Sequence, residues 1–384
     1  MRFEFATAQR IVFGPGTVNE AGRLAAELGR HALVVTGADA GRAASLLQRL
    51  REAGVSAVVS SVAGEPELDT VRRGAALARQ EHCDLVAAIG GGSVLDAGKA
   101  VAAMMTNDGD LLDYLEIIGR GQTLARRSAP FLAIPTTAGT GSEVTRNAVL
   151  ASPEHRVKVS LRSPFLLASV ALVDPELTRD LPPAITASTG LDALTQLIEP
   201  YVCARANPMS DALCEEGLRR AARSLRAAFA NGGDASARED MALASLFGGL
   251  ALANAGLGAV HGLAGPIGGM FPAPHGAVCA ALLPGVMQAN LRALRLRQPN
   301  SPALARYQSV ARLLTGQPQA GADDGVAWVR SLVAGLSISG LARYGIKKEN
   351  IGELAAKSAQ ASSMKANPVV LSPSEIAAVL EEAL

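Results

Sequence analysis

Charged side chains are missing from one long stretch of this sequence, and aromatic side chains are scarce throughout. No Asp, Glu, Lys or Arg occurs between Met241 and Leu291. Aromatic residues make up 3% of the 384 residues, and the formal net charge is +1. A net charge this close to zero gives no electrostatic basis for binding nucleic acid or an anionic membrane surface. We therefore expect a globular protein that binds neither nucleic acid nor membrane.

Cysteine is also rare, and its spacing is uninformative for metal or redox motifs. The four cysteines, Cys83, Cys203, Cys214 and Cys279, form no C-x-x-C pair. Scattered cysteines of this kind favour reduced thiols in a cytoplasmic protein. The first five residues lack a basic segment followed by an apolar one, so no secretory signal is visible.

The charge-free stretch has two interpretations, a membrane span or buried helices that line a site. Asn254, His261, His275, several prolines and many glycines interrupt it. A bilayer span needs a longer continuous apolar run than these interruptions leave. The stretch therefore indicates buried helices.

A run of three glycines follows a short apolar segment in the first half of the chain. Residues 84–89 are typical of a buried strand, and residues 94–105 have helical spacing. Gly90, Gly91, Gly92 and Ser93 lie between them. This order places backbone N–H groups against a phosphate, because no Cβ keeps a diphosphate away. The alternative is an ordinary tight turn. Ser93 either caps the helix or reaches a phosphate oxygen.

A second polar loop follows the next predicted strand, residues 130–135. Residues 136–145 carry five hydroxyl side chains and two glycines. They either hydrogen-bond a diphosphate and a ribose or form a solvated loop. Lys158 either adds positive charge beside the nucleotide or is a solvated surface lysine.

The two halves of the chain differ in their predicted secondary structure. Up to about Asp180, apolar strands alternate with helices, which predicts parallel βαβ units in an open sheet. From Ile185 onward the chain has helical patterns alone. We expect an α/β Rossmann-like domain over residues 1–182 that binds a dinucleotide, and an all-α domain over residues 183–384 that binds metal and substrate.

Four side chains in the helical half are candidate metal ligands. His261 and His275 lie in the charge-free stretch, where they are either hydrogen-bonded core residues or ligands. Asp192 and Gln196 have i, i+4 spacing and share one helix face. Asp192 is alternatively an acid that complements a helix dipole. A carboxylate, an amide oxygen and two imidazoles suit iron or zinc better than calcium or magnesium.

Taken in order, these motifs resemble the iron-containing (group III) alcohol dehydrogenase family, which has a dehydroquinate synthase-like fold. Residues 90–99 look like its cofactor-diphosphate loop, and residues 133–145 match its second signature almost letter for letter. Residues 172–177, 190–195 and 274–276 match further pieces. The resemblance covers nearly the whole chain and is weakest after about Arg297.

The resemblance implies a cleft between two domains that holds NAD or NADP and a divalent metal, usually iron. It also implies a homodimer. The metal falls on Asp192, Gln196, His261 and His275, and Asp192, His261 and His275 are also the catalytic candidates. The candidate cofactor positions are Gly37, Asp39, Gly90, Gly91, Gly92, Ser93, Asp96, Thr136, Thr137, Thr140, Ser142, Lys158 and Leu177.

Three positions depart from the family pattern. The family usually has His where this chain has Gln196, and it often has a further His where this chain has Gly265. Without that imidazole, we expect the proton to leave through water or the cofactor ribose. Family members that prefer NAD often carry Asp where this chain has Gly37. Gly37 leaves room for a 2′-phosphate, whereas Asp39 is placed to reach a ribose hydroxyl, so both cofactors stay open.

The sequence thus predicts a metal-dependent oxidoreductase that interconverts an alcohol and an aldehyde or ketone by hydride transfer. The substrate is a small, weakly charged molecule, since no cluster of charges marks an acid-binding pocket. Two alternatives remain: a non-redox lyase like dehydroquinate synthase, and a metal-poor relative that binds a dinucleotide without alcohol dehydrogenase activity.

Overall fold

The structure is a computed structural model that describes residues 2–384. The chain forms two compact units. The sheet unit comprises Ala6–Thr137 and Gly141–Arg179. The helical unit comprises Ala138–Thr140 and Asp180–Leu384, together with the start of the chain.

The sheet unit is built on a six-stranded parallel sheet with the order β1-β8-β5-β4-β2-β3. Its central strands are apolar on both faces, as expected when helices cover a parallel sheet on both sides. The six strands are β1 (Arg10–Phe13), β2 (His31–Gly37), β3 (Ser56–Val62), β4 (Leu85–Gly90), β5 (Phe131–Pro135) and β8 (Val170–Val173).

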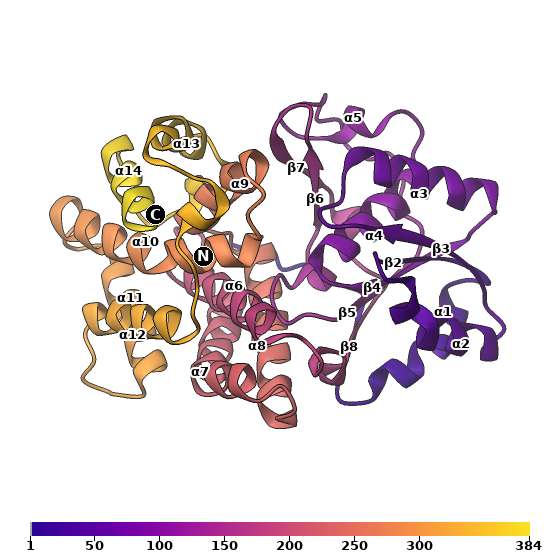
Figure 1. Cartoon of the computed structure of the whole chain (residues 1–384), viewed down its shortest axis with the longest axis horizontal. Helices are drawn as coiled ribbons and strands as arrows, with labels where there is room; N and C mark the ends of the chain where they lie inside the picture. Colours follow the sequence, from indigo (N-terminus) through magenta and orange to yellow (C-terminus); the bar gives the residue numbers. More distant parts are fainter. Residues whose placement is uncertain (1) are drawn as a thin grey trace. The chain divides into compact units, whose positions relative to one another are not determined.

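Helices pack on both faces of this sheet (Figure 1). The helices α1 (Ala21–Leu28) and α2 (Ala44–Glu52) share a core with alternate residues of the strands, including Val34 and Ala87. The helices α3 (Leu68–Gln80) and α4 (Gly92–Thr106) lie on the opposite face. A Cβ at Gly98 of α4 would meet the side chain of Ala88 at 2.8 Å. The α/β fold predicted for the first half is confirmed.

The strand order reverses between β2 and β4. These strands are paired, with Thr36 opposite Ile89. The chain leaves β2 for α2 on one face and leaves β4 for α4 on the other. Such a switch point opens a crevice beyond the carboxyl ends of the strands, where open α/β sheets bind ligands. Gly37 is the last residue of β2, and the glycine run begins with Gly90, the last residue of β4.

The helix after the glycine run begins earlier than predicted. Gly91 is the N-cap of α4, and its carbonyl accepts the N–H groups of Val94 (3.0 Å) and Leu95 (3.1 Å). Ser93 is therefore inside the first turn. Of the two roles predicted for Ser93, the helix cap is wrong, because the extended Gly91 takes that position and Gly92 is the first helical residue.

A two-stranded antiparallel sheet was not predicted. It consists of β6 (Asn147–Ser152) and β7 (Val157–Arg162). Along β6, buried and half-buried residues alternate, the pattern of a strand with one covered face. The backbone N–H of Val149 donates to Asp96 of α4 at 3.0 Å, which ties this sheet to the glycine-run helix.

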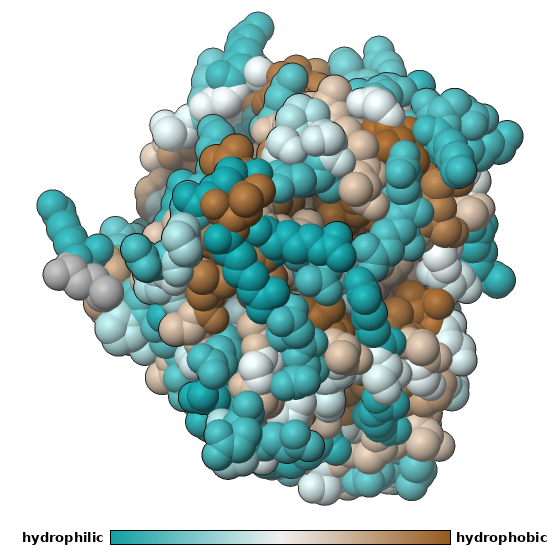
Figure 2. Space-filling view, turned by 90° about the vertical axis from the view of Figure 1, so that its left-hand side faces the viewer, coloured by the Kyte–Doolittle hydropathy of each residue, from teal (hydrophilic) through white to brown (hydrophobic). Residues whose placement is uncertain are grey.

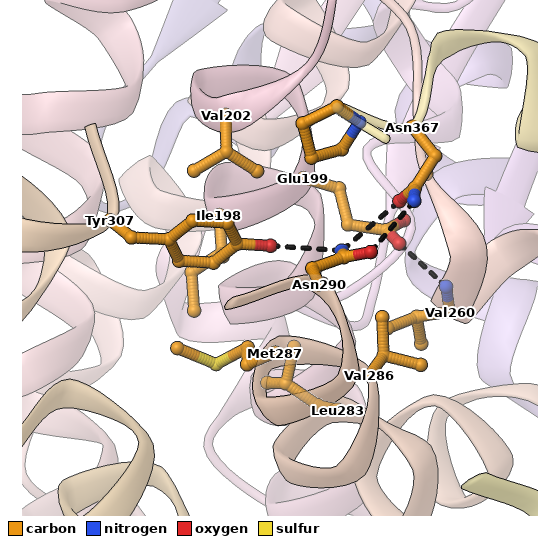
Figure 3. Close-up of a pocket in the computed structure, with 12 residues that line it drawn as sticks. Ile198, Glu199, Val202, Val260, Leu283, Val286, Met287, Asn290, Tyr307 and Asn367 are labelled. Carbon is orange, nitrogen blue, oxygen red and sulfur yellow. Dashed lines mark hydrogen bonds between the residues drawn. The ribbon is translucent and has the colours of Figure 1, made fainter. Parts of the chain in front are cut away.

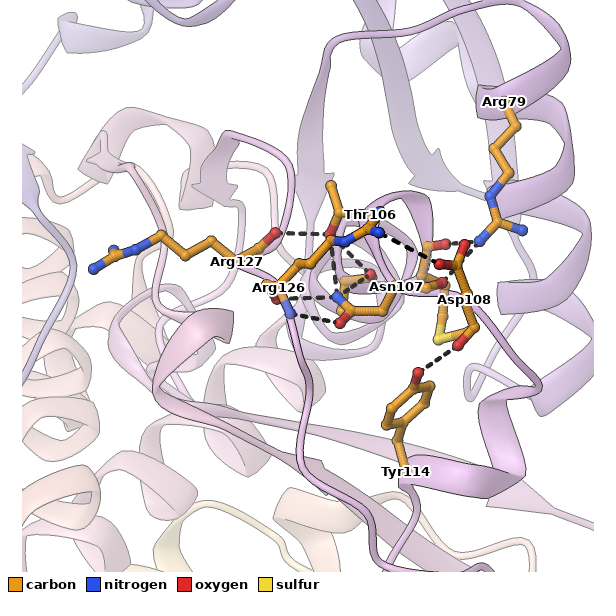
Figure 4. A network of polar contacts seen from close by, with 9 residues as sticks. Arg79, Thr106, Asn107, Asp108, Tyr114, Arg126 and Arg127 are labelled. Atoms are coloured by element: carbon orange, nitrogen blue, oxygen red, sulfur yellow. Dashed lines mark hydrogen bonds and ion pairs between the residues drawn. The ribbon is translucent and has the colours of Figure 1, made fainter.

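The long connection between α4 and β5 is closed by a polar network at the end of α4 (Figure 4). It contains the short helix α5 (Leu111–Tyr114). The buried amide of Asn107 donates to the carbonyl of Arg126 (3.0 Å) and accepts its N–H (2.9 Å). The hydroxyl of Thr106 donates to the carbonyl of Arg127 at 2.7 Å. These contacts fix the segment that leads into β5.

The helical unit confirms the all-α prediction for the second half. Its helices enclose one large apolar core. They are α6 (Pro183–Val202), α7 (Pro208–Ala230), α8 (Ala235–Asn254), α9 (Ala259–Met270), α10 (His275–Arg297), α11 (Pro302–Thr315), α12 (Ala322–Gly335), α13 (Ile351–Ala359) and α14 (Pro373–Glu382).

The charge-free stretch forms most of α8, all of α9 and most of α10. Among the described residues, α10 is long and apolar enough to cross a membrane, but 78% of the window that passes is buried within the protein. A buried apolar helix of this kind is typical of a soluble protein's core. The helices α8 and α9 pass the same test only as a pair bent by 96°. On the face drawn in Figure 2, hydrophobic residues form separate patches among hydrophilic ones.

Candidate metal centre and cofactor loops

Four side chains from three helices converge in the helical unit. Asp192 comes from α6, His261 from α9, and His275 and Cys279 from α10. One donor atom from each lies within 4.8 Å of every other. In the described part of the chain, this is the group of His, Cys, Asp and Glu side chains placed to hold a metal ion.

Helix α6 presents three polar side chains on one buried face. Asp192, Gln196 and Glu199 have i, i+4 and i+7 spacing, which places them on one side of a helix. All three are at least 96% buried. The helix α8 approaches this face closely, because a Cβ at Gly248 would meet the Cβ of Gln196 at 3.2 Å.

Glu199 binds the beginning of α9 and orients His261. Its carboxylate accepts the backbone N–H of Val260 (2.6 Å) and contacts Nδ1 of His261 (2.7 Å). A negative side chain at a helix N-terminus is stabilising. The contact with Nδ1 leaves Nε2 of His261 facing Asp192, 3.5 Å from Oδ1. Glu199 is therefore a partner that fixes the tautomer of a candidate ligand.

Glu199 belongs to a larger buried polar group, shown in Figure 3. Asn367 accepts the N–H of Ala259 at 3.1 Å and donates to Asn290 at 2.8 Å. Asn290 in turn donates to the hydroxyl of Tyr307 at 3.0 Å. These residues border a cavity of about 10 Å³, room for about one water. The network holds the N-terminus of α9 in place.

Helix α10 begins at His275, and its first turn fits closely against α6. A Cβ at Gly276 would lie 2.5 Å from the carbonyl oxygen of Ser188, so only glycine allows this approach. As a result, Nε2 of His275 lies 3.7 Å from Oδ1 of Asp192. Cys279 is one turn later on the same face of the helix.

The donors at this site fit a cation. Oδ1 of Asp192 and Oε1 of Gln196 are buried and have no hydrogen-bond partner among the described residues. Buried polar atoms without a partner are rare in proteins, and an ion that the structure does not contain is one explanation. Two imidazoles, a carboxylate and an amide oxygen suit a divalent transition metal.

The charges of the clustered side chains oppose the effect of burial on their pKa values. Burial favours the neutral carboxyl of Asp192, but His275 and His261 outweigh it and lower the pKa of Asp192. Burial also favours neutral imidazoles, yet Cys279 and Asp192 outweigh it and raise the pKa of both histidines. The carboxylate and the imidazoles therefore stabilise one another's charged forms, and a metal ion that binds here competes with protons for the imidazoles.

In the sheet unit, the two polar loops lie side by side at the carboxyl ends of β4 and β5. Gly90 pairs with Pro135, and Thr136 donates its N–H to the Gly90 carbonyl at 2.9 Å. A Cβ at Gly91 would meet the Thr137 side chain at 3.5 Å. A Cβ at Gly90 would clash with Val94 at 2.6 Å, so Gly90 has to be glycine. Thr140 lies in the segment that belongs to the helical unit.

A buried ion pair on α4 holds the second polar loop. Lys99 is 1% exposed and lies 2.9 Å from Asp96. It donates to the Ser142 carbonyl and the Thr145 hydroxyl, both at 3.0 Å. Asp96 accepts the Ser142 hydroxyl at 2.6 Å. Nearby, burial raises the pKa of Glu143 to about 7, although Lys99 and a backbone hydrogen bond lower it.

The comparisons with known proteins cover both units. The family model described as "Iron-containing alcohol dehydrogenase" matches residues 8–175. The model described as "Fe-containing alcohol dehydrogenase family, C-terminal" matches residues 186–384. The 1,3-propanediol dehydrogenase of Klebsiella pneumoniae is 37% identical over 99% of this chain and 98% of its own length.

Solved structures give the same result. A 1,3-propanediol oxidoreductase has a TM-score of 0.92 at 35% identity and full coverage of both chains. A sulfoacetaldehyde reductase from Bifidobacterium kashiwanohense, in complex with NAD⁺, has a TM-score of 0.86 at 29% identity, covering 100% of this chain and 99% of its own. The chain belongs to the iron-containing alcohol dehydrogenase family.

This iron-containing alcohol dehydrogenase is therefore a metal-dependent oxidoreductase that interconverts an alcohol and an aldehyde or ketone. The family binds NAD(H) and iron. Nothing in the comparisons favours the lyase or the metal-poor relative.

The remaining predicted cofactor residues of the dehydrogenase lie in several environments. Gly37 ends β2, and a Cβ there would meet no atom within 4 Å. Asp39 accepts the N–H of Gly41 (3.0 Å) and lies 3.7 Å from Arg42. Lys158 of β7 pairs with Glu65 at 2.9 Å and is 7% exposed. Leu177 packs against the core beneath α1 and α2. Lys158 is therefore not a solvated lysine.

The sequence pattern did not predict two residues of this candidate metal centre, Glu199 and Cys279. Glu199 lies seven residues after Asp192, a spacing that returns to the same helix face. Cys279 belongs to no C-x-x-C pair but follows His275 at i, i+4 spacing, which places both on one face of α10. Where the family often has another His, Gly265 has open space around its Cβ position.

Proposed function

We propose that Asp192, Gln196, His261 and His275 hold the divalent metal at which this dehydrogenase activates its substrate. One observation carries the proposal: an unpartnered buried carboxylate oxygen of Asp192 faces Nε2 of both histidines, at 3.5 and 3.7 Å. The bound metal supplies a Lewis acid that lowers the pKa of an alcohol.

The chain's own residues position the reacting groups. Asp192 supplies negative charge, and Glu199 keeps Nε2 of His261 free to act as a donor. The side chain of His275 is 33% exposed, compared with 7% for His261 and 2% for Asp192, so it is the most accessible of the three to solvent. With glycine at 265, we propose that the proton leaves through water or the cofactor ribose.

We further propose that residues 1–182 bind the dinucleotide and residues 183–384 the metal and substrate. Backbone N–H groups at Gly90, Gly91, Gly92 and Ser93 face the diphosphate, and the second loop adds Thr136, Thr137, Thr140 and Ser142. Both carboxylate oxygens of Asp96 already accept hydrogen bonds within the protein. In this proposal Asp96 therefore positions the loops. Gly37, Asp39, Lys158 and Leu177 complete the proposed set of cofactor-binding residues.

The cofactor is NAD or NADP, and the surroundings of Gly37 support both. The open space at Gly37 accommodates a 2′-phosphate, and Arg42 beside Asp39 is a cation placed to bind it. Asp39 itself suits a ribose hydroxyl. Initial rates with NADH and NADPH at equal concentrations decide between them. The substrate is a small, weakly charged alcohol or carbonyl.

The proposed setting is a cytoplasmic homodimer. All four cysteines are free, which supports a reducing compartment. The dimer is supported by family resemblance, and light scattering on the purified protein tests it.

Asp192→Asn tests the site. We expect the variant to lose bound metal and turnover together, because the amide keeps the shape and removes the charge. Metal content by mass spectrometry and aldehyde-dependent NAD(P)H oxidation are measured side by side. The control is Asp323→Asn, an exposed carboxylate paired with Arg295 in the same unit. Full turnover in an Asp192→Asn protein that contains no metal contradicts the proposal.

A further inference from the structure

We propose that the Cys279 thiolate is a fourth strong ligand of this metal centre and makes it a zinc-type site. The inference rests on the proposed function for the existence of the centre and goes beyond it in assigning the sulfur donor. Cys279 is fully buried. Its Sγ lies 3.6 Å from Nε2 of His275 and 3.9 Å from Nε2 of His261.

The spacing of the donors is that of a tetrahedral shell. Metal–ligand bonds of about 2.0 to 2.3 Å in zinc sites place the ligand atoms about 3.3 to 3.8 Å from one another. The two distances from Asp192 Oδ1 to the imidazoles are 3.5 and 3.7 Å, and the two from Cys279 Sγ are 3.6 and 3.9 Å. Four of the six edges of a tetrahedron are thus close to their ligated lengths.

A thiol that merely hydrogen-bonds explains less. The single S–H proton of Cys279 satisfies one of the two Nε2 atoms, and Oδ1 of Asp192 still has no partner. One cation among the four atoms satisfies all of them. The i, i+4 step from His275 to Cys279 supplies both donors from a single rigid helix face.

The donor set also determines which metal is favoured. Gln196 contributes a neutral amide oxygen, a weak donor, so the thiolate of Cys279 supplies the binding strength that this amide lacks. Carboxylate, two imidazoles and a thiolate are all zinc ligands, and sulfur favours zinc over harder ions. On binding, a sulfur–metal bond forms and the thiol proton passes to solvent, with no change of oxidation state.

Cobalt(II) substitution tests the inference without measuring activity. A thiolate ligand produces a sulfur-to-cobalt charge-transfer band in the near ultraviolet, which oxygen and nitrogen ligands lack. We expect the band in the cobalt-loaded wild type and in Cys214→Ala, a control that removes another buried thiol of the helical unit. We expect Cys279→Ala to bind cobalt without the band. Its zinc affinity falls at least about tenfold, since even outer-shell partners change affinity by about 10- to 100-fold.

A second measurement remains valid if Cys279→Ala fails to fold. X-ray absorption at the zinc edge of the zinc-loaded wild type should show a sulfur neighbour at about 2.3 Å from the metal. Stoichiometric cobalt binding without the band, or a zinc shell of oxygen and nitrogen alone, overturns the sulfur ligand and leaves the proposed function standing. Absence of any metal binding overturns both.

Discussion

At the scale of single residues, the position of His261 depends on Glu199. The same carboxylate accepts the Val260 N–H and contacts Nδ1 of His261, so it fixes a helix N-terminus and an imidazole at once. A partner of this kind aims the other ring nitrogen at the metal and raises its basicity. We therefore propose that Glu199 is a positioning residue of the candidate metal centre.

Glu199→Gln should weaken metal binding by about 10- to 100-fold, the usual effect of losing such a partner. The single amide oxygen of glutamine accepts one of the two hydrogen bonds and its NH₂ group opposes the other. Affinity is measured by competition with a chelator. Glu215→Gln is the control, because this carboxylate accepts a hydrogen bond from the Tyr201 hydroxyl away from the cluster. Unchanged affinity in Glu199→Gln contradicts the positioning role.

The residues of the metal centre differ in how far sequence predicts them. His261 and His275 lie in a stretch without charges. The sequence alone therefore indicates that they are buried, as hydrogen-bonded core residues or as metal ligands. The i, i+4 spacing relates Asp192 to Gln196 on one helix. Nothing local relates Cys279 to Asp192, since their contact depends on how α10 packs against α6. The role of Glu199 likewise depends on another helix, because its carboxylate accepts a backbone N–H at the start of α9.

At the scale of elements, the turn from β4 to α4 contains two glycines with different tasks. A Cβ at Gly90 has no room beside Val94, whereas one at Gly91 would make an ordinary contact with Thr137. Gly90 is thus needed for folding. Gly91 has room for a Cβ in this structure. We therefore propose that the missing side chain at Gly91 serves the approach of the cofactor.

Gly91→Ala should keep the melting temperature and weaken NAD(P)H binding at least about tenfold, or about 1.4 kcal/mol. Gly90→Ala should instead cost about 1 to 3 kcal/mol of stability through overpacking. Fluorescence titration and thermal unfolding measure the two effects. Gly352→Ala, at an open position on α13, is the control. If Gly91→Ala binds the cofactor as tightly as the wild type, the diphosphate does not lie against this turn.

Elements with strong periodicity were predictable, and elements that depend on partners were not. The strands β2, β4 and β5 are apolar on both faces and stand out in the sequence. The hairpin β6–β7 has one covered face, and its pairing with α4 depends on Asp96 reaching the Val149 N–H. The start of α4 was misplaced because Ser93 is a good cap, although Gly91 takes that position.

At the scale of the whole molecule, we propose that the sheet unit binds the dinucleotide and the helical unit binds the metal and substrate. The sheet unit has its switch point between β2 and β4, with glycine-containing loops on the strand ends there. The helical unit fixes four donor atoms by packing α6, α9 and α10 together. The central claim is that catalysis needs a cation held by this second unit.

Stepwise metal replacement tests that claim most directly. The protein is stripped with a chelator, zinc or iron(II) is added back in steps, and bound metal and the initial rate of aldehyde reduction by NAD(P)H are measured on the same samples. The rate should rise in proportion to occupancy and level off at one ion per chain. A full rate in the stripped protein, or a rate that does not follow occupancy, would contradict the account.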